Sequence, residues 1–102
     1  MCDVTEGEDV RKTVDLHDGA VLMTKRMEGT DGTEFPRHTA SLESALVMLE
    51  GSCTIAFPNA VHELRPGDTF IVPADVVHHV VGTPDFKAVH IMPKDIRFDF
   101  TV

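Results

Sequence analysis

The stretch that decides the fold is Gly67-Asp68-Thr69-Phe70-Ile71-Val72-Pro73-Ala74-Asp75-Val76-Val77-His78. A glycine turn is followed by a run that is β-branched or aromatic from Thr69 to Val72, which is typical of a strand, and the stretch ends on a histidine. An earlier stretch is organised in a related way, because Gly32 is followed after five residues by His38 and an apolar run then leads to Leu49-Glu50-Gly51. Either stretch alone is a weak signal. Together, in this order, the two stretches form a specific signal.

Short apolar stretches alternate with turn clusters from Val14 onward, at intervals that leave room for strands and not for long helices. Residues 53–57 alternate between apolar and small or polar side chains. In residues 86–92, Phe86, Ala88, His90 and Met92 share one face. Residues 96–100 predict a last, half-exposed strand. The pattern therefore predicts an all-β sandwich or barrel.

One segment conflicts with this pattern. Leu42, Ala45, Leu46 and Leu49 fall at helical spacing, after Ser41 and before a plausible capping glycine at Gly51. Propensity alone favours a helix over residues 41–50.

The two stretches together resemble the two motifs of the cupin superfamily, G-x5-H-x-H-x(3 or 4)-E-x6-G and G-x5-P-x-G-x2-H-x3-N, over about residues 29–82. The resemblance is to small single-domain, RmlC-like cupins of the cupin_2 type. It implies a small antiparallel β-barrel, that is, a jelly-roll-like double-stranded β-helix. It also implies that residues 41–50 form a strand with Leu46 and Met48 facing the interior. We expect an acidic N-terminal segment at residues 1–13, partly disordered, and a single cupin domain at residues 14–102.

The resemblance also implies a site in the barrel lumen. Family members use two histidines and a carboxylate of the first motif, with the histidine of the second, to bind one divalent iron, manganese, nickel, copper or zinc ion. In this chain His38 takes the first histidine position and His78 keeps the histidine of the second motif. Ala40 takes the second histidine position, and Ser44 the glutamate position. In the second motif Asp75 replaces the turn glycine and Gly82 the asparagine.

Two further residues are candidate ligands. A shifted register with a β-bulge makes Glu43 a ligand, whereas the register that we favour turns Ser44, Leu46 and Met48 inward and Glu43 outward. His90 is either a third lumen ligand or a hydrogen-bonded core histidine. The predicted metal set is therefore His38, His78, His90 and Glu43, and the predicted pocket set is Ala40, Ser44, Leu46 and Met48.

Composition bounds the function. The chain has 102 residues, of which 42% are apolar, and 9 basic against 17 acidic side chains give a net charge of −8. This size supports one core, and the acidic balance disfavours nucleic acid and membrane surfaces as partners. Cys2 and Cys53 are too few for a disulfide framework, and we expect a cytoplasmic protein. Cupins of this size commonly pair through sheet edges, so the resemblance implies a homodimer.

The leading hypothesis is a small cupin with a lumen site for a divalent metal or a small-molecule ligand or substrate, such as a metal-dependent dioxygenase or isomerase-like enzyme. The alternative is a non-catalytic cupin that acts as a ligand sensor or structural protein without metal.

Overall fold

The computed structural model describes residues 11–82 and 84–102, which contain ten strands and no helix. Within these ranges there is accordingly no helix that could span a membrane. The strands are β1 (Arg11–Asp18), β2 (Leu22–Gly29), β3 (Thr39–Ala40), β4 (Ser44–Glu50), β5 (Cys53–Phe57), β6 (Ala60–Leu64), β7 (Thr69–Val72), β8 (His79–Gly82), β9 (Phe86–Pro93) and β10 (Phe98–Asp99).

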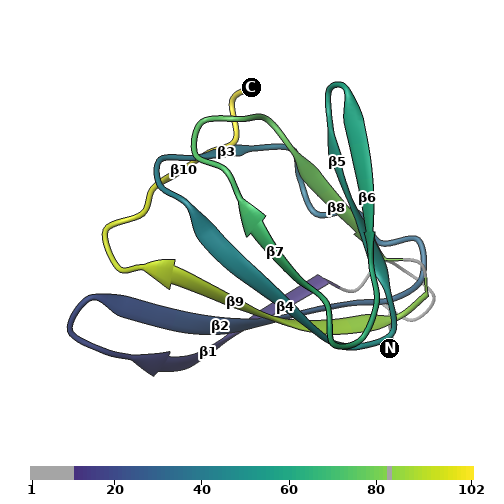
Figure 1. Cartoon of the computed structure of the whole chain (residues 1–102), viewed down its shortest axis with the longest axis horizontal. Coiled ribbons are helices and arrows are strands. Elements are labelled where there is room, and N and C mark those ends of the chain that lie inside the picture. The colour runs from purple at the N-terminus through teal and green to yellow at the C-terminus, as the bar shows by residue number, and fades with distance from the viewer. Residues whose placement is uncertain (1–10, 83) are drawn as a thin grey trace, which may run out of the picture.

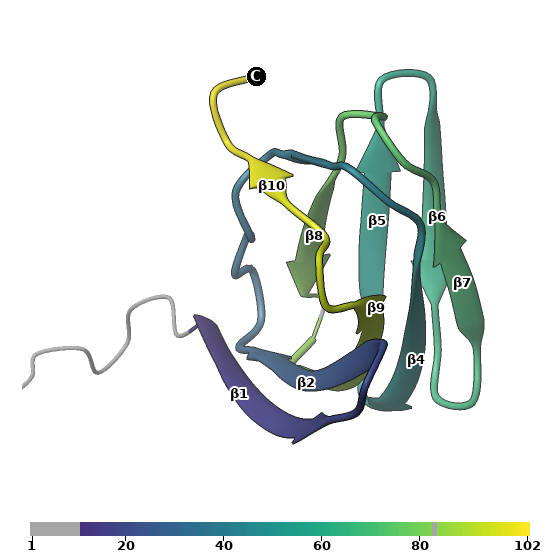
Figure 2. The ribbon, with the colours of Figure 1, turned by 90° about the vertical axis from the view of Figure 1, so that its left-hand side faces the viewer.

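The strands form antiparallel sheets that enclose one interior. A five-stranded sheet has the order β1-β2-β9-β4-β7, a three-stranded sheet the order β6-β5-β8, and β10 pairs with β3. In Figure 1, β1, β2 and β9 of the five-stranded sheet cross the lower part of the molecule, β4 and β7 run through its middle, and the β5–β6 hairpin stands to one side. Figure 2 shows β1 and β2 curving along the bottom and the chain leaving β10 near the top. The predicted all-β, jelly-roll-like architecture is confirmed.

The strand that the resemblance implies over residues 41–50 is confirmed at residues 44–50 but not at residues 41–43, and the helix that propensity alone favours does not form. Residues 44–50 form β4, which pairs with β7 on one side and with β9 on the other. Ser44, Leu46 and Met48 are buried, whereas the side chains between them are partly exposed, so the segment follows the period of a strand. Pairing on both edges and burial of one face outweigh the small difference in helix propensity over so short a window.

The core lies between the two larger sheets. Its fully buried members come from β4, β5 and β9 and include Leu46, Met48, Cys53, Ile55 and Ala88. Burial raises the pKa of the Cys53 thiol to about 11, so the thiol is protonated at neutral pH. Cys53 is thus a small hydrophobic core residue, as its place in the alternation of residues 53–57 predicts.

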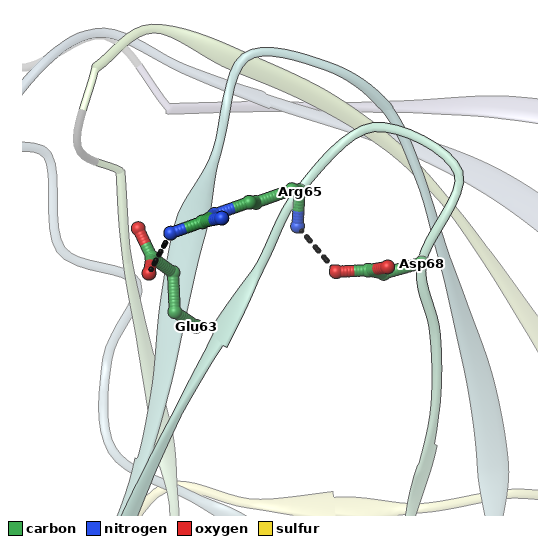
Figure 3. Close-up of polar contacts among 3 residues, drawn as sticks. All are labelled: Glu63, Arg65 and Asp68. Carbon is green, nitrogen blue, oxygen red and sulfur yellow. Dashed lines mark hydrogen bonds and ion pairs between the residues drawn. The ribbon is translucent and has the colours of Figure 1, made fainter.

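The turn between β6 and β7 sets the start of the second motif (Figure 3). The Asp68 carboxylate accepts a hydrogen bond from the Arg65 backbone N–H at 2.8 Å, and the Arg65 guanidinium bonds Glu63 at 3.1 Å. The Gly67 N–H donates to the Met48 carbonyl at 2.9 Å, and the Met48 N–H donates to the Asp68 carbonyl at 2.9 Å. The turn therefore fastens the start of β7 to β4.

Asp75, which stands at the glycine position of the second motif, has a backbone conformation that glycine adopts readily. Its φ is +63°, in the left-handed region that aspartate tolerates better than most residues. Its N–H donates to the Ala40 carbonyl at 2.7 Å, which ties this turn to β3. The turn before His78 is thus retained although the glycine is not.

Part of the expected N-terminal segment can be placed. Residues 11–13 of the expected segment 1–13 belong to β1, whose partner is β2. Residues 1–10 lie outside the described residues.

We predict that Gly51→Ala destabilises the fold far more than Gly67→Ala. Both glycines have positive φ, +69° and +91°, but a Cβ at Gly51 would lie 1.8 Å from the Asp85 carbonyl oxygen, whereas one at Gly67 meets nothing within 4 Å. We expect a loss of about 3 kcal/mol or more at Gly51 and about 1 kcal/mol at Gly67. Urea unfolding followed by far-UV circular dichroism measures both. Equal losses would contradict the close approach of residue 51 to Asp85.

Candidate functional site

His38 and His78 lie side by side although they come from the two separate motifs. Their backbones exchange two hydrogen bonds, from the His38 N–H to the His78 carbonyl at 3.0 Å and from the His78 N–H to the His38 carbonyl at 3.1 Å. This isolated antiparallel bridge lies immediately before β3 and β8. The ring centroids are 4.4 Å apart and the ring planes are inclined by 58°.

Each ring of this pair is oriented by a backbone carbonyl two residues earlier. Nδ1 of His38 lies 2.9 Å from the Pro36 oxygen, and Nδ1 of His78 lies 2.9 Å from the Val76 oxygen. A carbonyl only accepts, so Nδ1 carries the proton and Nε2 holds the lone pair whenever the ring is neutral. Burial lowers the pKa of His78, which favours its neutral form. The pair therefore offers two Nε2 lone pairs.

His90 is a third imidazole that faces the same interior. On β9 it pairs with Lys25 of β2 and with Leu46 of β4, and its Nε2 lies 2.7 Å from the Ser44 hydroxyl oxygen. Burial lowers the pKa of His90 to about 4, with smaller contributions from the charges of His38, His78 and Lys25. His90 is neutral at pH 7, and its partner is a side chain rather than the backbone.

The three histidines line one cavity of about 480 Å³. Most of its wall is apolar, and the wall includes two basic side chains, Arg11 and Lys25. The wall residues besides the histidines are Arg11, Thr13, Lys25, Met27, Phe35, Pro36, Leu46, Ile55, Val72, Val80, Met92, Phe98 and Phe100. A wall of this kind, with a few converging polar groups, is typical of a small-molecule site.

Aromatic rings surround the histidine pair. The His38 ring lies 5.5 Å from Phe98 and 5.1 Å from Phe100, and the His78 ring lies 5.6 Å from Phe57, as measured between centroids. Phe98 is brought there because β10 pairs with β3, opposite Ala40. The C-terminal segment therefore contributes one side of the site.

The structure separates the other predicted site residues. Glu43 is exposed and is not among the residues that line the cavity. Ser44, Leu46 and Met48 are buried, as the favoured register predicts. Of the predicted pocket set, only Leu46 lines the cavity. Ser44 reaches the site through His90, and Ala40 and Met48 belong to the core.

The remaining histidines lie elsewhere. His79 lines a different, smaller hollow with Arg37 and Phe57 and is not among the residues that line the cavity of His78. His62 packs against Phe57 and Phe70, with centroids 5.9 Å and 4.9 Å away. Sequence reasoning did not identify Arg11, Lys25, Phe98 or Phe100 as site residues. Phe98 and Phe100 lay in the strand predicted over residues 96–100, whereas Arg11 fell in the expected acidic segment and Lys25 in no predicted strand. The strand pairing that brings Arg11, Lys25 and Phe98 to the cavity joins distant parts of the chain.

The donor chemistry of the pair suits a divalent transition metal. A neutral imidazole whose Nδ1–H bonds a carbonyl is the usual form of a metal-binding histidine. Among residues 11–82 and 84–102, however, no group of three His, Cys, Asp or Glu side chains is close enough to hold one ion. The fit is therefore that of two protein ligands, His38 and His78.

Comparison with known proteins agrees with this architecture. The chain resembles a cupin superfamily protein of Desulfitobacterium hafniense at 22% identity, with a TM-score of 0.77 over 84% of this chain and 79% of that one. It resembles a cupin-2 domain protein of Shewanella frigidimarina at 21% identity, with a TM-score of 0.74 over 81% and 80% of the two chains. At these identities the likeness concerns the fold alone.

A third similar structure is the salicylate 1,2-dioxygenase of Pseudoaminobacter salicylatoxidans, solved in complex with gentisate. It shares 15% identity and a TM-score of 0.79 over 89% of this chain, which spans only 29% of the dioxygenase chain. No curated protein matches the chain. The family model described as "Cupin domain" matches residues 25–92, which include His38, His78 and His90. The chain is therefore a member of the cupin family.

Proposed function

We propose that this cupin binds a small molecule in the cavity lined by His38, His78 and His90, and that the His38–His78 pair is also its site for a divalent metal ion. The observation that carries the proposal is the convergence of three imidazoles on one largely apolar cavity of about 480 Å³. Cavities of about 300–1,000 Å³ with few polar groups are usual for small ligands. We also propose a single cupin domain at residues 14–102, to whose cavity Arg11 and Thr13 at the start of β1 contribute.

The metal part of the proposal rests on ring orientation. The carbonyls of Pro36 and Val76 hold the Nδ1 protons, which leaves both Nε2 atoms of the pair as donors. A divalent iron, manganese, nickel, copper or zinc ion would supply Lewis-acid chemistry to a bound small molecule. His38 and His78 would hold the ion, and Ser44 keeps His90 in a hydrogen bond beside them.

We predict weak, pH-dependent metal binding. Two neutral histidines give an affinity that falls by about tenfold or more when the pH is lowered from about 7.5 to about 5.5, because protons compete for Nε2. Calorimetric titration of metal-stripped protein with Ni²⁺ or Zn²⁺ measures this affinity. His38→Ala and His78→Ala should each abolish binding, and His62→Ala is the matched control outside the cavity. Unchanged stoichiometry in the His38→Ala/His78→Ala double variant would contradict the assignment.

A second candidate function is a metal-dependent enzyme of the dioxygenase or isomerase-like kind. It is favoured by the fold likeness to a dioxygenase solved with gentisate. The non-catalytic alternative, a ligand sensor or structural cupin, needs no metal. The same metal titration distinguishes the enzyme from the non-catalytic cupin. If His90 leaves Ser44 to become a third metal ligand, His90→Ala weakens metal binding; if it does not, metal binding is unchanged. Three protein ligands and an open position favour catalysis.

We predict that His90 makes stability fall as the pH is lowered. The pKa of His90 is 6.5 in the unfolded chain and about 4 in the fold, so the unfolded state binds the proton first. Stability is therefore complete above about pH 6.5 and is lost towards pH 4, by up to about 3 kcal/mol. The lowered pKa of His78 acts in the same direction.

Urea unfolding between about pH 7.5 and pH 4.5 measures the effect. His90→Gln should reduce the loss of stability, whereas the control His62→Gln should leave it unchanged. The same pH dependence in the His90→Gln variant and in the original chain would contradict the buried, neutral state of His90.

We also propose that the chain forms a homodimer, through the outer face of the five-stranded sheet rather than through the sheet edges that the resemblance implies. Support comes from a central apolar patch on β4, β7 and β9, formed by Ala45, Val47, Ile71, Val89 and Ile91. In the single chain, Ile71 is 58% exposed. A second copy seated there would bury this patch.

A further inference from the structure

We propose that the ligand of this cavity is a small organic anion, with an apolar body held against the apolar wall and a single anionic group held by Lys25 and Arg11. This inference rests on the proposed small-molecule site and names the chemistry of its ligand.

The charge of the cavity wall is opposite to that of the whole chain. The protein has 17 acidic and 9 basic residues and a net charge of −8. The wall nevertheless contains Arg11 and Lys25, and none of the described residues that line it is Asp or Glu. Charges on a low-dielectric wall act over the whole cavity, so this local reversal favours an anion.

Strand register fixes the position of these cations. Arg11 and Thr13 share one face of β1, and Lys25 and Met27 share the facing side of β2, where Thr13 pairs with Met27. Lys25 in turn lies directly opposite His90 on β9. Because a one-residue slip would turn every side chain to the other face, Lys25 is held towards the cavity by the same pairing that holds His90.

The present partners of both cations leave room for a ligand. Lys25 Nζ lies 3.3 Å from the Asp15 carboxylate, but the Asp15 side chain is 84% exposed. Such an exposed ion pair contributes about 1 kcal/mol or less, so a second anion can join or displace it. Arg11 donates one N–H to the Glu34 carbonyl at 3.0 Å, which orients the guanidinium and leaves its other donors for a ligand.

The rest of the wall selects an apolar body. Met27, Leu46, Ile55, Val72 and Met92 face the cavity. In the protein without metal, the Nε2 lone pairs that His38 and His78 hold whenever their rings are neutral repel an anionic group. The anionic group is therefore directed to the β1–β2 side, and the apolar body lies against the other strands. A compact inorganic anion could use the cations but not this wall.

The test compares benzoate with benzamide and benzylamine, which have the same ring and carry no charge or a positive charge. Calorimetry, together with the ring resonances of His38, His78 and His90, measures binding at these residues. We expect benzoate to bind more tightly than benzamide, by about tenfold or more. We expect benzylamine not to bind. Raising the salt from about 0.05 M to about 0.5 M should weaken benzoate but not benzamide.

The variants Lys25→Met and Arg11→Met should each weaken benzoate by about tenfold and leave benzamide unchanged. Lys12→Met is the matched control. It removes one positive charge from β1, as Arg11→Met does, but the Lys12 side chain lines a separate hollow with Glu28 and Glu50. Equal binding of benzoate and benzamide, or equal loss in the Lys12→Met variant, would overturn the anion inference and leave the small-molecule site standing. If none of the three compounds shifts the ring resonances of His38, His78 and His90, both the anion inference and the proposed small-molecule site are contradicted.

Discussion

The reciprocal pair of backbone hydrogen bonds between His38 and His78 is the constraint on which the site depends. It joins the ends of two motifs that are distant in the chain, and it sets two imidazoles at a centroid separation of 4.4 Å. The orientation of each ring is fixed by a hydrogen bond from its Nδ1 to the backbone carbonyl two residues earlier. The geometry of the site therefore comes from the backbone, and losses elsewhere in the cupin motif do not remove it.

This constraint explains how a cupin with an incomplete ligand set keeps an organised site. Ala40 and Ser44 replace a histidine and a glutamate of the motif, yet both are buried at inward positions. Ser44 then bonds His90, whose low pKa keeps it neutral beside Lys25. Burial, rather than ion pairing, governs the charge state of this interior. Arg11 and Lys25, on the β1–β2 side, are the basic side chains among the described residues that line this interior.

The limits of sequence reasoning follow from the same physics. Strands 53–57 and 86–92 were predictable because alternation with period two is local, and the buried face of β4 followed from the register of the motif. Propensity failed at residues 41–50 because pairing with β7 and β9 is decided elsewhere in the chain. Arg11, Lys25 and Phe98 reach the cavity through cross-strand register, which no short stretch of sequence encodes, and Phe100 follows directly after β10. Spacing left the place of Glu43 open, and the fold exposes its side chain.

The most direct test of this account is the tautomer of the two paired imidazoles. Long-range proton–nitrogen correlation spectra at roughly pH 7.5 distinguish a protonated Nδ1 from a protonated Nε2, and His38→Gln and His78→Gln assign the signals. The account predicts that both neutral rings carry the proton on Nδ1, with Nε2 unprotonated and facing the cavity. A proton on Nε2 of either ring would contradict it, because that ring would then offer no lone pair to a ligand or metal.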